Sequence, residues 1–355
     1  MKIYNSSENI DKKKWENLLR EPNYNIFFQS EQYYNFLTIT EYLMPFVHAI
    51  EVNNKLKALV CGFIQRDGGL FKQFFSRRAI IIGGPIITNL TNIKISEELL
   101  NSIVNQLRKK TIYIEIRNLH DTSNYKNLFL INNFFFKDHY NYIVDTTDFD
   151  IMKSRIKNNK LRQIRKSLRN GARIKDNITP IDISRFYLIL QHLYKTKVKK
   201  PLFPLSYFQE LYKTSFCKFL LVEYNDRIVG GIVLLFDEDT VYEHYICGEN
   251  KKFNKIHPSV LATWAGLEYA ANNGFEKFDF MGAGKPKIKY GVRDFKRHFG
   301  GDLVNYGRYI RINKPLLYKI GKLGLLIKGE FDKYIYLLRL KFDLFSKKGN
   351  MWTFL

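Results

Sequence analysis

The first 145 residues alternate between segments with a helical period and short apolar runs typical of strands. Two of these runs flank Asn53-Asn54, a dipeptide that favours a tight turn between strands. Helices are expected at 30–40 and 96–110, with Ser30 and Ser96 as their caps. Strands are expected at 46–52, 57–64, 78–88, 111–116 and 139–145.

The same order of elements returns after residue 150. It begins with an amphipathic helix within 153–175, which Gly171 is expected to end. Further helices are expected around 181–198, 205–214 and 258–273. Strands are expected at 217–223, 228–236, 240–247, 276–280 and 304–312. The pattern therefore predicts an α/β protein built from two mixed-sheet units of about 150 residues each.

We expect an N-terminal domain at 1–150, a C-terminal domain at 151–312 and a tail at 313–355. The tail mixes Lys and Arg with many Leu, Ile, Tyr and Phe residues. Such a basic amphipathic helical segment either lies on an anionic membrane surface or packs back on the domain as an ordinary helix pair.

The chain is strongly basic, with 57 Lys and Arg against 34 Asp and Glu and a net charge of +23. Ten of these bases and no acid lie within 153–175. A surface of this kind attracts polyanions such as nucleic acid, anionic lipids or pyrophosphate-bearing substrates.

Three cysteines without metal-ligand or pairing spacing predict reduced thiols in a cytoplasmic protein. No apolar signal segment opens the sequence, and no apolar run is long enough to span a bilayer. Neither a metal-binding motif nor a Ser-His-Asp spacing is present, so we expect no metal and no bound cofactor.

Residues 278–301, FDFMGAGKPKIKYGVRDFKRHFGG, join a short strand to a glycine turn and a basic, aromatic run. The turn is not a phosphate-binding P-loop, because Pro286 stands where that motif needs Ser or Thr. Its chemistry has to be sought elsewhere.

Several segments together resemble a known family. These are IGGP at 82–85, TIYIEIRN at 111–118, NKLRQIRK at 159–166, the run 257–282 and FKRHFGG at 295–301. Their order and spacing resemble the FemABX family, which has a duplicated GNAT acyltransferase fold. The resemblance implies transfer of an amino acid from aminoacyl-tRNA to an amine of a peptidoglycan precursor, lipid-linked or nucleotide-linked, at the inner face of the membrane.

Two departures from known patterns bear on the donor. Residues 185–215 leave no room for the coiled-coil arm that the wall-bridge members often carry, so no contact with tRNA through such an arm is expected. Residues 250–260, NKKFNKIHPSV, lack the glycines with which acyl-CoA-dependent GNAT proteins hold a pyrophosphate at a helix N-terminus. The donor is therefore expected to be aminoacyl-tRNA, with acyl-CoA as the alternative.

In a GNAT-like fold the substrates meet where two strands separate, here 240–247 and 276–282. The resemblance implies that Lys296, which follows Phe295, stabilises the oxyanion of the scissile ester. Asp279 either accepts the amine proton or pairs with an arginine as a structural carboxylate. Glu243 and His244 lie on opposite faces of their strand, so only one of them points toward the gap.

Arg162 and Arg165 are the expected grip for a phosphate-bearing substrate, because guanidinium groups bind phosphate in a bidentate manner. The helix that carries them could instead contact the tRNA backbone or form a plain solvated face. Tyr290 and Lys285 would extend the same basic wall, and Phe295 is a further expected substrate-binding residue. Two rival functions remain: an acyl-CoA-dependent N-acyltransferase acting on an amino sugar or another envelope amine, and a nucleic-acid-binding protein that uses residues 153–175.

Overall fold

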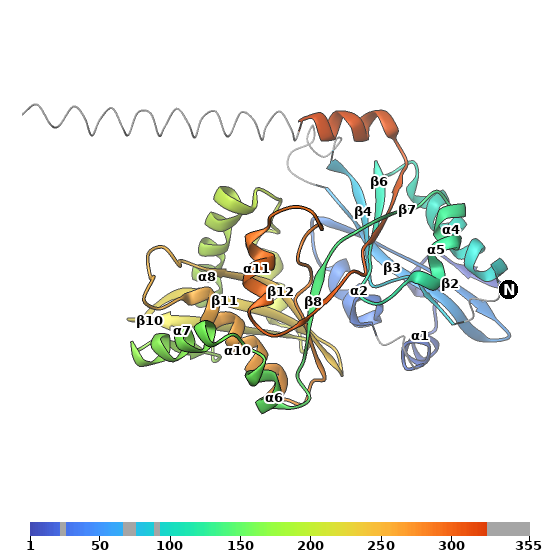
Figure 1. The fold of residues 1–355 in the computed structure, drawn as a ribbon. Helices are drawn as coiled ribbons and strands as arrows, with labels where there is room; N and C mark the ends of the chain where they lie inside the picture. Colours follow the sequence, from blue (N-terminus) through green and yellow to red (C-terminus); the bar gives the residue numbers. More distant parts are fainter. Residues whose placement is uncertain (22–25, 67–75, 89–92, 325–355) are drawn as a thin grey trace, which may run out of the picture.

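The computed structural model describes residues 1–21, 26–66, 76–88 and 93–324 of the 355-residue chain. Two halves lie side by side, each built around one twisted, mostly antiparallel sheet (Figure 1). The first sheet has the order β1-β2-β3-β4-β6-β15-β7, with β5 paired to β3. Its strands are β1 (Lys2–Tyr4), β2 (Leu43–Val52), β3 (Lys55–Gln65), β4 (Arg78–Ile82), β5 (Ile86–Ile87), β6 (Tyr113–Arg117), β7 (Phe135–Lys137) and β15 (Arg308–Ile312).

The second sheet has the order β14-β8-β13-β12-β11-β10-β9. Its strands are β8 (Asn141–Asp145), β9 (Arg173–Lys175), β10 (Cys217–Tyr224), β11 (Arg227–Phe236), β12 (Thr240–Gly248), β13 (Lys277–Asp279) and β14 (Asp302–Val304). A mixed α/β fold of two similar units, expected from the order of elements, is confirmed.

The two halves exchange strands. β8, which was expected to close the first half, pairs with β13 and β14 of the second sheet. The strand expected at 304–312 is interrupted at Gly307, and its second part, β15, returns to β6 and β7 of the first sheet. The sequence pattern identifies a strand but not its partner, which is why the pattern placed both strands in the wrong sheet.

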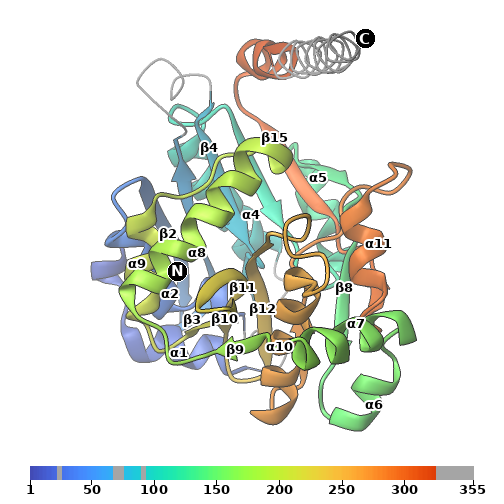
Figure 2. The same cartoon turned by 90° about the vertical axis from the view of Figure 1, so that its left-hand side faces the viewer.

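The helices form two outer layers and one middle layer. α4 (Ile93–Leu107) and α5 (Lys126–Ile131) cover the outer face of the first sheet, and α7 (Asn158–Arg169) and α10 (Pro258–Asn272) cover the outer face of the second. Between the sheets lie α1 (Lys12–Leu19), α2 (Glu31–Thr38), α8 (Pro180–Leu193) and α9 (Leu205–Tyr212). The short helices α6 (Phe149–Ser154) and α11 (Gly291–Arg297) flank β8 (Figure 2).

Local chemistry sets several helix boundaries. The side chain of Ser30 accepts from Tyr33 N at 3.1 Å and caps α2, as expected. Gly171 follows α7 with a φ of +90°, a conformation that costs glycine little. Ser96 is not a cap: α4 begins at Ile93, so Ser96 lies buried within its first turn.

One apolar core joins the two halves. Phe28 packs on Tyr242 of β12 with ring centroids 5.0 Å apart, and Phe36 packs on Tyr207 of α9 at 5.2 Å. The same cluster includes Ile82 of the first sheet. Because these rings are buried on both sides, the first half fixes the position of β12, the strand on which the site is built.

The described chain ends in a helix over 315–324 that runs above β6 and β7 (Figure 1). Tyr318 holds it there through the ring of Tyr113, 5.4 Å away, and the ammonium of Lys137. The remainder of the expected tail, 325–355, lies outside the described residues. No helix in the described ranges combines the length and apolar character of a bilayer span.

Candidate functional site

The second sheet opens between β12 and β13. The two strands run parallel and pair at three positions only, the last being Tyr242 with Asp279. β12 continues to Gly248 while pairing with β11 on its other side. Glu243 is therefore the first residue beyond the point at which the two strands separate.

Lys296 of α11 reaches into this fork. Its ammonium lies 2.9 Å from Glu243 Oε1. It also donates to the carbonyl oxygens of Phe280 at 2.6 Å and Gly282 at 2.9 Å, which follow β13. The side chains of Lys296 and Glu243 are only 9% and 3% exposed. One buried cation thus ties together the two strands that no longer pair.

Glu243 keeps one oxygen free. Oε1 binds Lys296, whereas the buried Oε2 has no partner among the described residues. Burial raises the pKa of the carboxyl, and the charge of Lys296 counters part of that rise. A buried carboxylate with an open lone pair and a raised pKa is suited to accept a proton.

His244 points elsewhere. A bulge in β12 leaves it outside the register between Val233 and Leu234 on β11. Its Nε2 lies 2.8 Å from the hydroxyl of Tyr207 in the core between the halves, and burial lowers its pKa to about 3. Of the two neighbours, it is therefore Glu243 that faces the fork.

Asp279 ends β13 and is also buried. Its Oδ1 accepts from Asn141 Nδ2 at 2.7 Å and from the backbone N–H of Met281. Burial raises the pKa of this carboxyl. No arginine is a hydrogen-bond or ion-pair partner of Asp279 among the described residues, so the contacts of this carboxylate do not support an Asp–Arg pair.

A strained turn follows Asp279. Met281 has a φ of +57° and Gly282 a φ of +126°. Asn141 Oδ1 accepts from Gly282 N at 2.7 Å, so one side chain of β8 binds both Asp279 and the turn. The turn directs the Gly282 carbonyl at Lys296. Sequence reasoning missed Asn141; a polar residue between Tyr140 and Tyr142 was the one available signal.

Arg162 and Arg165 are exposed on α7, where they line a hollow of about 370 Å³ with Asn158 and Leu161. Within the described part of the chain, neither arginine forms an ion pair. Lys296 does not line this hollow.

α7 and α11 are nevertheless neighbours. Lys157 N donates to His298 O at 3.0 Å, and the Lys160 ammonium lies 4.8 Å from the centre of the Phe295 ring. The basic helix and the segment that carries Lys296 therefore occupy the same part of the second half.

The other expected binding residues lie around the turn rather than in the fork. Phe295 is partly buried against Phe299, with ring centroids 5.1 Å apart. Tyr290 precedes α11 and is exposed, as is Lys285. The Lys285 carbonyl accepts from Arg293, which holds the loop on α11. Phe295 therefore packs in the core, whereas Tyr290 and Lys285 are available to a ligand.

The N-terminus of α10 is already satisfied. Asn250 Oδ1 accepts from Ser259 N at 3.1 Å, and Asn250 Nδ2 donates to the Ser259 hydroxyl at 2.7 Å. A pyrophosphate bound at this helix end would have to displace Asn250. This contact agrees with the absence of glycines between residues 250 and 260.

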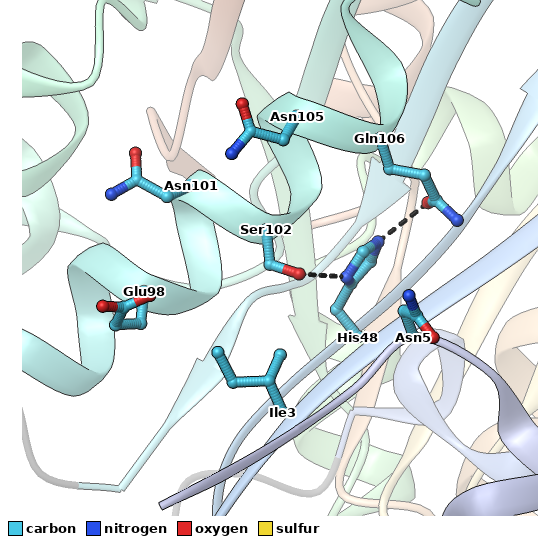
Figure 3. Close-up of a pocket in the computed structure, with 8 residues that line it drawn as sticks. All are labelled: Ile3, Asn5, His48, Glu98, Asn101, Ser102, Asn105 and Gln106. Atoms are coloured by element: carbon cyan, nitrogen blue, oxygen red, sulfur yellow. Dashed lines mark hydrogen bonds between the residues drawn. The ribbon is translucent and has the colours of Figure 1, made fainter.

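The described strands of the first half form no comparable fork. β4 and β6 are its parallel pair, and they remain in register over all five residues of each strand. Its polar hollow, about 430 Å³, lies instead beside α4 and is lined by His48, Ser102 and Gln106 among others (Figure 3). His48 Nδ1 lies 2.7 Å from Ser102 Oγ and Nε2 lies 2.8 Å from Gln106 Oε1. Both ring nitrogens are thus engaged in joining β2 to α4.

Comparison with known proteins agrees with this arrangement. Residues 154–297 match the family model of the acetyltransferase (GNAT) domain. The fold is similar to the crystal structure of FemX, with a TM-score of 0.66, 14% identity and coverage of 90% of this chain and 99% of that one. No curated protein matches the sequence.

Two further structures share the fold. One is the C-terminal DUF2156 domain of an Agrobacterium fabrum protein described as a lysylphosphatidylglycerol synthetase, with a TM-score of 0.56, 9% identity and coverage of 88% of this chain and 95% of that one. The other is a tandem GNAT protein of clavulanic acid biosynthesis, with a TM-score of 0.51, 8% identity and coverage of 77% and 84%. The chain is an acyltransferase with a FemABX-like GNAT fold.

Proposed function

We propose that the protein transfers an aminoacyl group from aminoacyl-tRNA to an amine of a peptidoglycan precursor. The buried Lys296–Glu243 pair at the fork of β12 and β13 is the observation that carries the proposal. In this proposal the pair supplies a cation and a proton acceptor at the point where the two strands stop pairing.

Glu243 Oε2 accepts a proton from the ammonium of the acceptor, which frees the nitrogen lone pair. The amine attacks the carbonyl carbon, a C–N bond forms and the carbonyl oxygen becomes negative. The ester C–O bond then breaks, the proton held by Glu243 passes to the leaving oxygen, and Glu243 takes up the extra proton that the nitrogen releases as it becomes a neutral amide. Asp279, one strand away, holds the turn and offers a second carboxyl.

Lys296 supports this sequence through its charge. Its three N–H groups already meet Glu243, Phe280 and Gly282. A direct hydrogen bond to the oxyanion therefore requires that one of these acceptors be released. Protonation of Glu243 weakens the ion pair, so we propose that Lys296 turns toward the oxyanion as Glu243 takes up the amine proton.

The matching GNAT domain favours a second candidate, transfer from acyl-CoA to an amino sugar or another envelope amine. Glu243 would transfer the proton in the same way, but the thioester C–S bond of acyl-CoA would break in place of the ester C–O bond of aminoacyl-tRNA. Against it, the Ser259 N–H at the start of α10 is bound by Asn250. In the tRNA case the exposed lysine and arginine side chains of α7 are suited to the phosphate backbone.

The C-terminal helix is proposed to contact the membrane on which lipid-linked precursors lie. Leu316, Ile320 and Leu323 follow one helical face and are all exposed. Lys319 and Lys322 lie among them in sequence. A helix with this composition binds an anionic bilayer surface in the interfacial plane.

A transfer assay with the full chain tests the proposal. The acceptor is a nucleotide-linked muropeptide, and the donor is either tRNA charged with labelled amino acids or labelled acetyl-CoA. Amide-linked label from charged tRNA, lost in Glu243→Gln, is the expected result. Lys296→Ala is expected to lower kcat with the KM values largely kept. Label from acetyl-CoA alone favours the second candidate, and no transfer from either donor overturns both.

A further inference from the structure

A group of positive side chains lies on the face of the first sheet that looks toward the second half. Glu115 and Arg117 share this face of β6, and Arg308 of β15 is the direct cross-strand partner of Arg117. On the same face, β4 contributes Ile80 and Ile82 to the core between the halves. The interface is therefore apolar at β4 and becomes cationic at β6 and β15.

One carboxylate and one imidazole hold this group in place. Arg117 Nε donates to Glu115 Oε1 at 3.1 Å, and Arg308 donates to the same oxygen. The second terminal nitrogen of Arg308 donates to His139 Nε2 at 2.9 Å, so the imidazole proton sits on Nδ1. Burial, together with the charges of Arg308 and Lys200, lowers the pKa of His139 to about 3. The ring is therefore neutral.

The positive charge exceeds what the carboxylate can balance. Burial raises the pKa of Glu115, but Arg117 and Arg308 outweigh this and lower it to about 2, so Glu115 is ionised. Lys200 adds a third cation: desolvation and the charges of Arg308 and Arg117 lower its pKa. Like charges on directly paired strand positions destabilise a sheet. Neither the terminal nitrogens of Arg117 nor the Lys200 ammonium meets a described acceptor.

This cationic cluster, defined as Arg117, Arg308 and Lys200, adjoins the fork. A Cβ placed on Gly282 would lie 3.1 Å from His139 Nε2, so the ring that Arg308 holds touches the turn. The carbonyl of Gly282 is the one that Lys296 binds. Across the interface, the charge of Arg117 acts on Tyr245, which lies two residues beyond Glu243 on β12.

We propose that the cationic cluster binds an oxyanion, a phosphate or a carboxylate, carried by the molecule that reacts at Lys296 and Glu243. The two terminal nitrogens of Arg117, which meet no described acceptor, suit a bidentate contact with an oxyanion. Lys200 adds a point charge from the exposed segment after α8. Anion binding at the cationic cluster does not depend on acyl transfer. Only the identity of the molecule that carries the anion rests on the proposed function. The substrate would then be an anionic amine or ester that spans the two halves.

Calorimetric titration tests this without any activity. The full chain carrying Arg162→Gln, which removes the hollow on α7 as a competing site, is titrated with inorganic phosphate, pyrophosphate and acetate at constant, high ionic strength. Arg117→Gln and Lys200→Gln are each expected to weaken binding about tenfold or more, the size of one charge-assisted hydrogen bond. Arg169→Gln, an exposed arginine on α7, is the matched control and should leave binding unchanged. Preference for phosphate or for acetate identifies the anion.

Equal affinities in all variants overturn the proposal, as does the absence of binding to any of the three anions. Lys200→Gln decides the matter if Arg117→Gln does not fold, because Lys200 is exposed and outside the sheet. Anion binding that depends on Arg117 or Lys200 supports the site even where the transfer assay fails. Transfer activity without such anion binding would support the proposed function and overturn the proposed anion site.

Discussion

Lys296 and Glu243 meet at 2.9 Å where β12 and β13, neighbouring strands of the second sheet, stop pairing. The resemblance to GNAT proteins implies that such a fork receives a substrate, and here the ion pair lies at its base. The pair is almost fully buried, so the protein retains two charges at a cost in desolvation. The proposed reaction, which needs both a cation and a proton acceptor, would account for that cost.

The two charges are expected to depend on each other. Removing either partner leaves the other charge buried alone, at a cost of about 3–5 kcal/mol in the free energy of unfolding. The double variant Lys296→Met/Glu243→Met avoids that penalty, although the Phe280 and Gly282 carbonyls still lose their donor. Urea unfolding of both single variants and the double variant should give a coupling energy of about 2 kcal/mol or more. Strictly additive losses would show that the pair is not energetically linked.

The stability of the protein should fall as the pH rises through the range in which Glu243 ionises. Burial raises its pKa above the ordinary value, so the native state holds a proton that the unfolded chain has already released. Between the ordinary and the raised pKa, the free energy of unfolding therefore decreases with rising pH. Glu243→Gln removes this dependence, and its stability relative to the wild type should increase with pH. The exposed Glu238→Gln is the control; a parallel change in both variants would contradict this assignment.

The sequence pattern of the strand was enough to name Glu243 and His244 as candidates, because side chains alternate along a strand and one of two neighbours must face the fork. It could not choose between them, since the choice depends on the bulge against β11. The burial of Lys296 has no local signal at all: α11 reads GVRDFKR and looks like a solvated helix. Only the resemblance to FemABX pointed to this lysine.

Contacts between distant strands were beyond the sequence. Asn141 and Asp279 are 138 residues apart and meet because β8 leaves the first half to pair in the second. Glu115 and Arg308, 193 residues apart, meet because β15 makes the opposite exchange. Periodicity gives the face of a strand but not its neighbour, so both the Asn141 contact and the cationic cluster required the structure.

The hollow on α7 should affect substrate binding rather than turnover. Arg162→Ala and Arg165→Ala are each expected to raise the KM of a phosphate-bearing acceptor about tenfold, the value of one charge-assisted contact, with kcat within about twofold. Arg169→Ala serves as the control, because it is exposed on the same helix but does not line the hollow. Steady-state kinetics with varied acceptor measures the effect. Unchanged KM values would show that these arginines do not bind the acceptor, and would leave a solvated helix face or a contact with tRNA as the interpretation of α7.

The helix over 315–324 should bind anionic vesicles through its exposed apolar face. Leu316→Glu and Ile320→Glu place a charge in that face, at 71% and 46% exposed positions where folding does not need the leucine or isoleucine. Sedimentation with vesicles rich in phosphatidylglycerol should show binding by the wild type and its loss in the double variant. Ser154→Glu, exposed on α6, adds one negative charge elsewhere and should leave binding intact. Equal sedimentation of all three proteins would exclude this face as the contact.

In the first half an uncharged side chain, Gln29, joins two strands as Lys296 does in the second half. Gln29 is completely buried; its Nε2 donates to Cys61 O at 3.0 Å and Ile82 O at 2.7 Å, and its Oε1 accepts from Cys61 N at 2.8 Å. Gln29→Leu leaves these backbone groups without partners and should lower the free energy of unfolding by about 2–4 kcal/mol. Gln32→Leu, exposed on α2, should change it by less than about 0.5 kcal/mol.

Because Gln29 joins strands without a charge, kcat of the folded Gln29→Leu variant should remain within about twofold of the wild type, in contrast to Lys296→Ala. A large loss of kcat in folded Gln29→Leu would mean that the first half takes part in the chemistry, and that the fork of the second half is not sufficient for it.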